Sequence, residues 1–388
     1  MTIKKYAVIL LGKLLFRLLR LLLSGGTYLP GKTALRLCPD ILSFAAQNVR
    51  TILVTGTNGK TTTVHMIAHM LQAEKTPCFA SFSGGNEKSS ICTEYILNYD
   101  LIRRKPKTAL AVIECDEKYV PLVVPDVSPR VIIVTNIFKD QTDRLGSEED
   151  VFRLFCDAML PADAVFCLSE DEPYGQRLMD ALSVKTIIRY SGSVGAARID
   201  GQRVSLRIRL PGNYNYKNAA AACAALYALR QLTDRAVAAL ETVPIPFGRM
   251  EPITVDGVDV TLNLAKNVRG AEETLRFLAS CGGAQKIVLG FNAQIEDGQD
   301  VSWIWEVPWK QYTAELRDVF VYGECAAFTE GVLHENGISA SQIDDAGELL
   351  TQIQKSAAPV FLMMNYTCMM AFRKTLAAKG YVKDFWNR

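Results

Sequence analysis

The sequence predicts an α/β protein of two domains, a doubly wound parallel sheet in the middle of the chain and a smaller α/β domain after it. Three observations lead to this prediction. Short β-branched runs alternate with longer stretches of helical spacing from Thr51 onward. A glycine loop joins the first of these runs to a helix. A segment rich in proline and glycine at 242–252 interrupts the alternation, which then resumes.

The strands of the first domain are predicted from five apolar runs, because strands buried on both faces of a parallel sheet lack polar alternation. These runs are TILVTG (51–56), TALAVIECD (108–116), RVIIVTN (130–136), DAVFCLS (163–169) and KTIIRYS (185–191). Helical spacing occurs at 64–74, 150–160, 173–182 and 218–232. Between the last strand and the segment beginning at Val204 the chain has lone glycines, and we expect a short loop there.

The same alternation returns in the second domain. Strands are expected at 285–292, 317–324 and 358–365, and helices at 271–281, 326–336 and 346–355. We therefore divide the chain into an N-terminal helix and lead-in at 1–40, a central domain at 41–244 and a C-terminal domain at 245–388.

Composition excludes several classes of protein. The 388 residues include 43 Lys plus Arg and 41 Asp plus Glu, so no global basic field favours wrapping of nucleic acid. Apolar residues make up 49% of the chain, which is typical of a folded globular protein. Ten cysteines are scattered without a C-x-x-C pair, and the three histidines form no H-E-x-x-H motif. We therefore expect reduced thiols in a cytoplasmic protein and no zinc site.

Residues 4–24 form a very apolar segment that Lys13, Arg17 and Arg20 interrupt at i, i+4 and i+7. The charges argue against a membrane-spanning helix, and no small-residue cleavage site follows the apolar run. Two interpretations stay open. The helix packs on the protein with its basic face in water, or it makes a peripheral contact with anionic lipid.

The strongest chemical signal is ILVTGTNGKTTTVHMIAHML, in which a strand runs through a glycine loop into a helix. Glycines let backbone N–H groups approach phosphate oxygens, and the helix N-terminus adds a positive dipole. Lys60 would reach the terminal phosphates and the Thr61 hydroxyl would bind Mg²⁺. Val54 occupies the position of the first glycine of the general motif. The expected nucleotide-binding residues are Gly56, Thr57, Asn58, Gly59, Lys60, Thr61 and Thr62.

Acidic and amide side chains follow the next two predicted strands. Glu114, Asp116 and Glu117 follow the strand at 108–116, and Asn136 follows the strand at 130–136. The carboxyl ends of parallel strands meet at one sheet edge, so we expect Glu114 to bind Mg²⁺ there and Asn136 to contact the nucleotide. For Asp116 and Asp140, metal coordination and a solvated loop remain equal alternatives.

These motifs resemble the Mur ligase superfamily, whose members activate a carboxylate with ATP. The resemblance rests on GTNGKTT (56–62), Glu114, TNIFKDQTDRLG (135–146), GNYNYKN (212–218) and FGRME (247–251). It implies a Mur ligase-type central ATP-binding domain and a Rossmann-like C-terminal domain. It further implies that Asn215 and Asn218 lie by the adenine and that Arg249 reaches toward the nucleotide.

Within the superfamily the chain resembles the MurT family of lipid II isoglutaminyl synthase subunits, on the strings at 25–42, 297–307 and 365–376. Amino-acid-adding relatives commonly use a carbamylated lysine that has no counterpart here, since no lysine lies between Lys139 and Lys185. The resemblance implies that the chain amidates the D-glutamate α-carboxylate of lipid II in peptidoglycan biosynthesis. Its partner would be a GatD-type glutaminase that supplies ammonia in a heterodimer.

The resemblance also assigns residues in the C-terminal domain. Asp300 would complete the partner's Cys-His pair as the third member of a triad, with Asp297 as the alternative. Lys266 stands in a motif expected near the phosphates or the substrate. The four-cysteine zinc ribbon usual in this family is missing, which again predicts no zinc.

Two other functions remain open. The chain could act alone as an amino acid ligase of the Mur or folylpolyglutamate type, although the missing lysine and the string DVSWIW at 300–305 count against this. It could also be a non-catalytic, nucleotide-binding scaffold, as the lost ribbon and the altered string KNVRG at 266–270 would allow.

Overall fold

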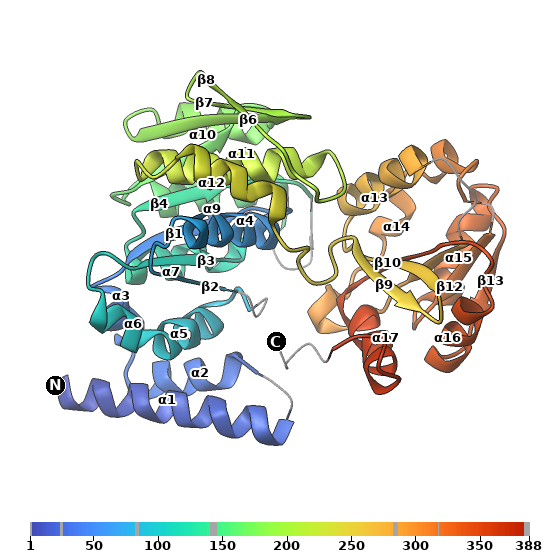
Figure 1. Ribbon diagram of the computed structural model, residues 1–388, viewed down its shortest axis with the longest axis horizontal. Helices are drawn as coiled ribbons and strands as arrows, with labels where there is room; N and C mark the ends of the chain where they lie inside the picture. The colour runs from blue at the N-terminus through green and yellow to red at the C-terminus, as the bar shows by residue number, and fades with distance from the viewer. Residues whose placement is uncertain are drawn as a thin grey trace. The chain divides into compact units, whose positions relative to one another are not determined.

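The computed structural model describes residues 2–23, 26–81, 85–139, 146–281, 286–316 and 318–383, and the chain divides into two compact units (Figure 1). Unit 1 comprises Met1–Phe138, Ser147–Arg209 and Asn213–Pro244. Unit 2 comprises Lys139–Gly146, Leu210–Gly212 and Ile245–Arg388.

The described part of unit 1 is built on an eight-stranded sheet with the strand order β2-β3-β1-β4-β5-β6-β7-β8. The strands are β1 (Arg50–Thr55), β2 (Cys78–Ala80), β3 (Leu110–Glu114), β4 (Val131–Val134), β5 (Val165–Ser169), β6 (Thr186–Ser193), β7 (Ala196–Ile199) and β8 (Gln202–Ser205). β1 lies between β3 and β4, and the strands from β2 to β6 are all parallel. The predicted parallel sheet is confirmed.

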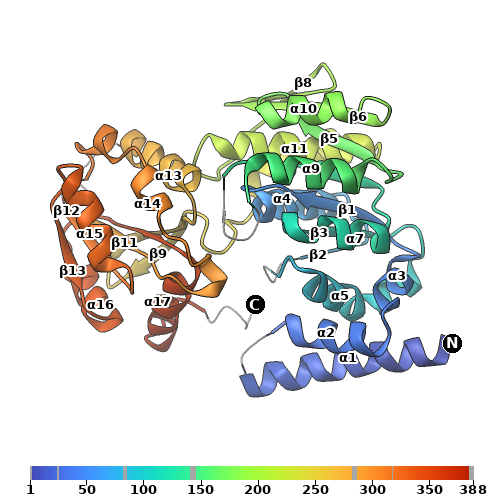
Figure 2. The same cartoon turned by 180° about the vertical axis from the view of Figure 1, so that it is seen from behind.

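Helices cover both faces of this sheet, as the prediction of a doubly wound fold requires (Figures 1 and 2). α4 (Lys60–Ala73), α11 (Tyr214–Ala228) and α12 (Asp234–Ala239) lie on one face. α7 (Val120–Val127), α9 (Glu148–Met159) and α10 (Pro173–Ala181) lie on the other. Two short helices adjoin them: η1 (Glu117–Tyr119) precedes α7, and η2 (Leu240–Thr242) follows α12.

The expected short loop between β6 and the segment at Val204 is wrong. The chain there forms β7 and β8, two antiparallel strands that extend the sheet. Asp200 and Gly201 turn between them with φ values of 49° and 83°. A turn with two positive φ values matches the twist of a hairpin, and Asp-Gly is a common sequence for it. The dipeptide Asp200-Gly201 is therefore a hairpin signal in the sequence.

The N-terminal helix α1 (Thr2–Leu23) packs within unit 1 against α2 (Tyr28–Leu37), α3 (Ile41–Ala46) and α5 (Lys88–Leu97), which α6 (Tyr99–Arg104) follows. Lys13 is not part of a water-facing basic stripe, because its amine pairs with Asp100 at 2.7 Å. Several apolar side chains of α1 are also highly exposed, Ile3 at 85% and Leu21 at 81% among them. Within the described ranges, no helix combines the length and apolar character needed to cross a membrane.

Unit 2 has a described sheet of six strands in the order β13-β12-β11-β14-β10-β9, with β9 alone antiparallel to its neighbour. The strands are β9 (Glu251–Val255), β10 (Val258–Leu264), β11 (Lys286–Gly290), β12 (Asp318–Tyr322), β13 (Ala340–Ile343) and β14 (Val360–Met364). Its helices are α13 (Val268–Cys281), η3 (Ile295–Asp297), α14 (Trp303–Glu306), η4 (Trp309–Tyr312), α15 (Ala326–Glu335), α16 (Ala346–Gln354) and α17 (Tyr366–Ala378). The smaller α/β domain is confirmed.

Apolar clusters lie on both faces of this second sheet. Phe291, Ile304 and Trp309 belong to one cluster, and Leu362 and Phe372 belong to the other. The β9–β10 hairpin, which the sequence analysis did not predict, turns at Asp256 and Gly257 with positive φ values. It is a second instance of an Asp-Gly hairpin turn.

Candidate nucleotide-binding site

The glycine loop connects the end of β1 to the start of α4, as the sequence predicts. Gly56 has a φ of 114°, and a Cβ there would lie 2.5 Å from Thr135 Oγ1 and 2.6 Å from the Asn136 carbonyl oxygen. Gly59 has a φ of 87°, and its Cβ would lie 2.3 Å from Asn218 Oδ1. These approaches and φ values demand glycine at both positions.

The first turn of α4 offers backbone N–H groups to an anion. Gly59 is the N-cap and supplies no capping side chain, and the intrahelical bonds begin with Thr63 N–H donating to the Gly59 carbonyl at 2.9 Å. The N–H groups before that bond, on Lys60, Thr61 and Thr62, lie at the positive end of the helix dipole. This arrangement fits a phosphate group.

Asn136 holds the loop in shape. Its Oδ1 accepts from Asn58 N–H at 2.9 Å and its Nδ2 donates to the Asn58 carbonyl at 3.1 Å. Its own carbonyl accepts from Thr57 N–H at 3.0 Å, and the Thr57 hydroxyl accepts from Phe138 N–H at 3.0 Å. The Asn136 side chain, which was expected to contact a nucleotide, thus connects the glycine loop to the end of β4 by hydrogen bonds.

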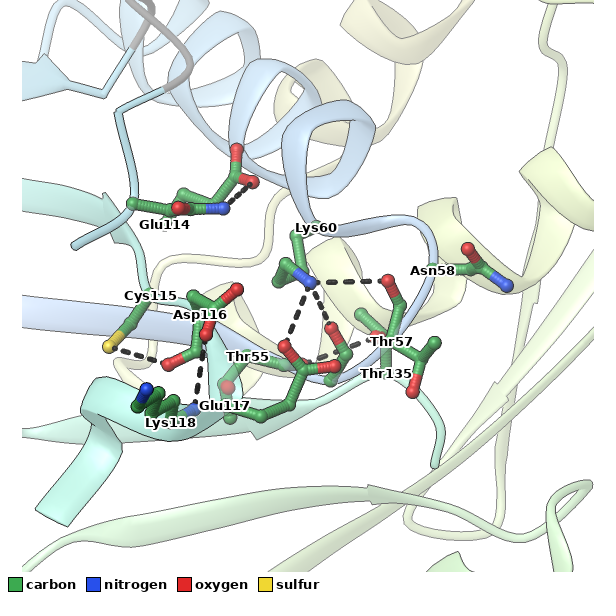
Figure 3. A network of polar contacts seen from close by, with 12 residues as sticks. Thr55, Thr57, Asn58, Lys60, Glu114, Cys115, Asp116, Glu117, Lys118 and Thr135 are labelled. Carbon is green, nitrogen blue, oxygen red and sulfur yellow. Dashed lines mark hydrogen bonds and ion pairs between the residues drawn. The ribbon is translucent and has the colours of Figure 1, made fainter. Parts of the chain in front are cut away.

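Lys60 lies folded over the loop, with only 6% of the residue exposed. Its amine donates to the Gly56 carbonyl at 2.5 Å and the Thr57 carbonyl at 3.1 Å, and it pairs with Glu117 Oε2 at 3.2 Å (Figure 3). Glu117 is itself 2% exposed. The position of Glu117 after β3 was predictable from the sequence, but its pairing with Lys60 was not.

Thr61 and Glu114 come together at the end of β3. The Thr61 hydroxyl donates to Glu114 Oε2 at 2.8 Å, and Asn86 Nδ2 lies 3.4 Å from the other carboxylate oxygen. Glu114 is 4% exposed. A hydroxyl and a carboxylate side by side are oxygen ligands of the kind that Mg²⁺ takes beside substrate phosphates. Among the described residues, no group of three or more His, Cys, Asp or Glu forms a metal site of its own.

Asp116 does not join Glu114. Its carboxylate accepts from Lys118 N–H at 3.1 Å and begins the short helix η1, so it shapes a turn (Figure 3). The buried Cys115 thiol beside it has a pKa well above its usual value, chiefly because of burial. Asp140, Gln141 and Asp143 lie outside the described residues.

Asn215 and Asn218 lie buried in the first turns of α11. Asn218 Nδ2 donates to Asn215 Oδ1 at 2.9 Å, and the Oδ1 of Asn218 closes over Gly59. Asn218 therefore lies beside the glycine loop, although it is about 160 positions later in the chain than Gly59. Beside them Lys217 pairs with Glu172 at 2.8 Å.

Arg249 and Lys266 belong to unit 2, whereas the loop and its partners belong to unit 1. Arg249 precedes β9, and Lys266 lies between β10 and α13; both are half-buried. The adjacent Asn267 is buried and accepts from Gly270 N–H at 2.8 Å, which caps the start of α13. Their approach to a nucleotide stays a prediction.

The two candidate aspartates differ in their surroundings. Asp297 is 6% exposed and accepts from the N–H and the hydroxyl of Thr367 at the start of α17. Burial raises the pKa of its carboxyl, and the bonds from Thr367 oppose that shift. Asp300 is exposed, and its Oδ1 accepts from Ser302 N–H at 2.8 Å. In the string after it Trp303 is half-buried and Trp305 is 50% exposed.

Comparisons with known proteins agree with this geometry. The Mur ligase middle domain matches residues 54–226, and the MurT ligase C-terminal domain matches residues 264–369. The MurT subunit of lipid II isoglutaminyl synthase (glutamine-hydrolyzing) from Staphylococcus aureus (strain COL) is 26% identical, over 82% of this chain and 84% of that protein. The subunit of the same name from Streptococcus pneumoniae (strain ATCC BAA-255 / R6) is 25% identical, over 94% of this chain and 95% of that protein.

Solved structures share the fold. MurF from Acinetobacter baumannii superposes with a TM-score of 0.70 at 18% identity, over 90% of this chain and 80% of that one. The bifunctional folylpolyglutamate synthase/dihydrofolate synthase from Yersinia pestis, complexed with AMPPNP and Mn ion, gives 0.65 at 18% identity, over 87% and 92%. With a Mur ligase middle domain, a MurT C-terminal domain and MurT relatives along most of its length, the chain belongs to the MurT family of the Mur ligase superfamily.

Proposed function

We propose that this chain is the ATP-using subunit of a lipid II isoglutaminyl synthase. It activates the α-carboxylate of D-glutamate in lipid II as an acyl phosphate, and ammonia then displaces phosphate to give D-isoglutamine. A GatD-type glutaminase supplies the ammonia as the second subunit of a heterodimer. The observation that carries this proposal is a phosphate loop with Thr61 and Glu114 paired beside it, in the same chain as a MurT C-terminal domain.

Mg²⁺-ATP would supply the phosphoryl group that turns the carboxylate into a substrate for ammonia. The N–H groups of Lys60, Thr61 and Thr62 hold phosphate oxygens at the α4 N-terminus. The Lys60 amine, already within the loop, neutralises the charge that develops during transfer. Thr61 and Glu114 would hold the Mg²⁺ ion.

Glu117 is a positioning residue in this proposal. It pairs with Lys60 at 3.2 Å inside the protein, so it holds the amine over the loop. The resemblance to Mur ligases assigns Asn215 and Asn218 to the adenine, and Asn218 lies next to the loop at Gly59. The same resemblance assigns Arg249 and Lys266 of unit 2 to the nucleotide-binding residues.

Asp300 is the residue that completes the Cys-His pair of the glutaminase partner. Its carboxylate is exposed and therefore accessible to a histidine of another chain, whereas Asp297 is buried and bonded to Thr367 within unit 2. A carboxylate that accepts from a histidine fixes its tautomer and stabilises its protonated form. Because the lipid-linked substrate is made inside the cell, the reaction takes place in the cytoplasm at the inner face of the membrane.

The decisive assay mixes the full chain with its candidate glutaminase, Mg²⁺-ATP, glutamine and lipid II, and looks by mass spectrometry for an amide in place of a carboxylate. Lys60→Ala should abolish product with either nitrogen source. Asp300→Ala should abolish product with glutamine but keep it with an ammonium salt, because only the glutaminase step is lost. Asp318→Ala, at another exposed aspartate of unit 2, is the matched control.

Three outcomes would overturn the proposal. No amidated product with an active glutaminase and bound ATP would favour a non-catalytic scaffold. Amino-acid-dependent ADP release by the chain alone would favour a Mur or folylpolyglutamate type of ligase. Equal loss of product from Asp300→Ala with glutamine and with ammonium would remove Asp300 from the glutaminase step.

A further inference from the structure

The outer face of α1 carries a continuous stripe of apolar side chains. Its members recur at helical spacing and point away from the rest of unit 1; we call them the α1 stripe: Ile3, Ala7, Leu10, Leu11, Leu14, Leu18 and Leu21. Leu10 is 67% exposed and Leu14 is 54% exposed. Seven apolar residues along one face of a 22-residue helix form a patch of the kind that soluble surfaces rarely leave uncovered.

The opposite face of α1 is firmly packed, which determines the direction of the stripe. Val8 and Ile9 are buried, and a Cβ at Gly12 would lie 3.1 Å from the Ile96 side chain on α5. The Tyr6 ring packs edge-on against Phe44 at 5.9 Å. Figures 1 and 2 both show α1 at the outside of unit 1, with α2 and α5 on its inner side.

Two ion pairs hold the helix to unit 1. Lys5 pairs with Asp40 at 2.5 Å, and Lys13 pairs with Asp100 at 2.7 Å. The lysine side chains are 12% and 15% exposed. The stripe is therefore presented on a docked helix, and covering the stripe would not require α1 to leave the protein.

The charges on α1 itself are all positive, and Asp40 and Asp100 of the neighbouring segments pair with two of them. Residues 2–23 include five basic residues and no acidic residue. Lys4 and Arg17 are exposed and lie at the two margins of the stripe by helical position, and the exposed Arg20 follows on the side of Arg17. An apolar face with cations at its margins is complementary to a bilayer surface that contains anionic lipid.

We propose that the α1 stripe lies in the surface of an anionic membrane, with the helix axis in the membrane plane. The leucines enter the boundary between headgroups and acyl chains, while Lys4, Arg17 and Arg20 contact lipid phosphates. A second copy of the chain fits less well, because two stripes face to face would bring these cations together with no carboxylate on either helix. This inference stands apart from the proposed amidation and is tested without ATP, glutamine or a partner.

The test is flotation of the full chain with two kinds of vesicle, pure phosphatidylcholine and phosphatidylcholine with phosphatidylglycerol. The chain should float with the anionic vesicles. Leu10→Gln/Leu14→Gln/Leu21→Gln should lower the apparent partition coefficient by on the order of 100-fold, because each leucine loses its transfer into the interface. Lys4→Gln/Arg17→Gln should lower it by roughly fivefold per charge and weaken its dependence on salt.

The matched control is Leu122→Gln/Leu160→Gln, which changes two exposed leucines of unit 1 outside α1 and should float like the unaltered chain. Thermal melting shows whether each variant folds, and light scattering reports its oligomeric state. Failure of the folded chain to float overturns the proposal, as does equal flotation of the triple variant. A dimer that the triple variant converts to a monomer, with no flotation of either, assigns the stripe to a second copy instead.

Discussion

Substitution of Gly59 by alanine tests whether the phosphate loop depends on its contact with α11. The backbone there has a φ of +87°, and the new Cβ would lie 2.3 Å from Asn218 Oδ1. A left-handed conformation costs a non-glycine residue about 1–2 kcal/mol. The steric conflict with a buried neighbour adds about 1–3 kcal/mol. Gly59→Ala should therefore destabilise unit 1 by a total of about 2–5 kcal/mol.

The chain offers a control that separates these two contributions. Gly195 has a φ of +79° but no atom within 4 Å of its Cβ position. Gly195→Ala should cost only the backbone part, about 1–2 kcal/mol. The double variant Gly59→Ala/Asn218→Ala removes the conflict, so its two changes should be less than additive by about 1–3 kcal/mol.

Urea unfolding followed by circular dichroism measures these differences. The four tryptophans belong to unit 2, so tryptophan fluorescence reports that unit separately. Binding of an ATP analogue, measured by calorimetry, should fall for Gly59→Ala and stay unchanged for Gly195→Ala. Equal unfolding of the two alanine variants, or strict additivity in the double variant, would refute the steric argument.

Three further predictions follow from the described contacts. Glu117→Gln leaves the buried Lys60 amine without its carboxylate and should destabilise unit 1 by about 3 kcal/mol in urea unfolding. The same change at Glu149, which pairs with Arg177 on the surface, should cost less than about 1 kcal/mol, and similar costs for both would contradict the buried pairing. Burial raises the Asp297 pKa, so the contribution of this carboxyl to stability is fully present below its unfolded pKa of 3.8 and is lost as pH rises through its folded pKa. Asp297→Asn should therefore flatten this part of the pH dependence of unit 2 unfolding, measured by tryptophan fluorescence. An unchanged pH profile would contradict this prediction. All ten cysteines lie in described residues, and Cys281 is the exposed one. Cys281→Ser should therefore remove the fast phase of labelling by a thiol reagent in the native protein. A fast phase that persists would indicate local opening at another thiol.

The position of the glycine loop was predictable from local sequence. The strand before Gly56, the glycines and the helix after them are consecutive, so their pattern predicted the loop without knowledge of the fold. The same holds for Glu114, because a residue at the end of a buried parallel strand must lie at the carboxyl edge of the sheet.

The choice between neighbouring acidic residues needed the structure. Asp116 and Glu117 are adjacent at the start of η1. Asp116 accepts from the N–H of Lys118 in a turn, whereas Glu117 points inward and pairs with Lys60. The pattern of charges does not distinguish them, since both follow the same strand. The difference between Asp297 and Asp300 is of the same kind, because it depends on Thr367, about 70 positions away in the chain.

The sequence by itself determined the two α/β domains, the glycine loop and the family, because periodicity and contiguous motifs are local properties. It did not determine which face of α1 is covered, since apolar residues surround that helix on most sides. The covered face is set by contacts with other segments. Lys5 pairs with Asp40 and Lys13 pairs with Asp100. Gly12 lies against Ile96. Only tertiary packing selects among faces of similar composition, because the selecting contacts come from residues distant in the chain.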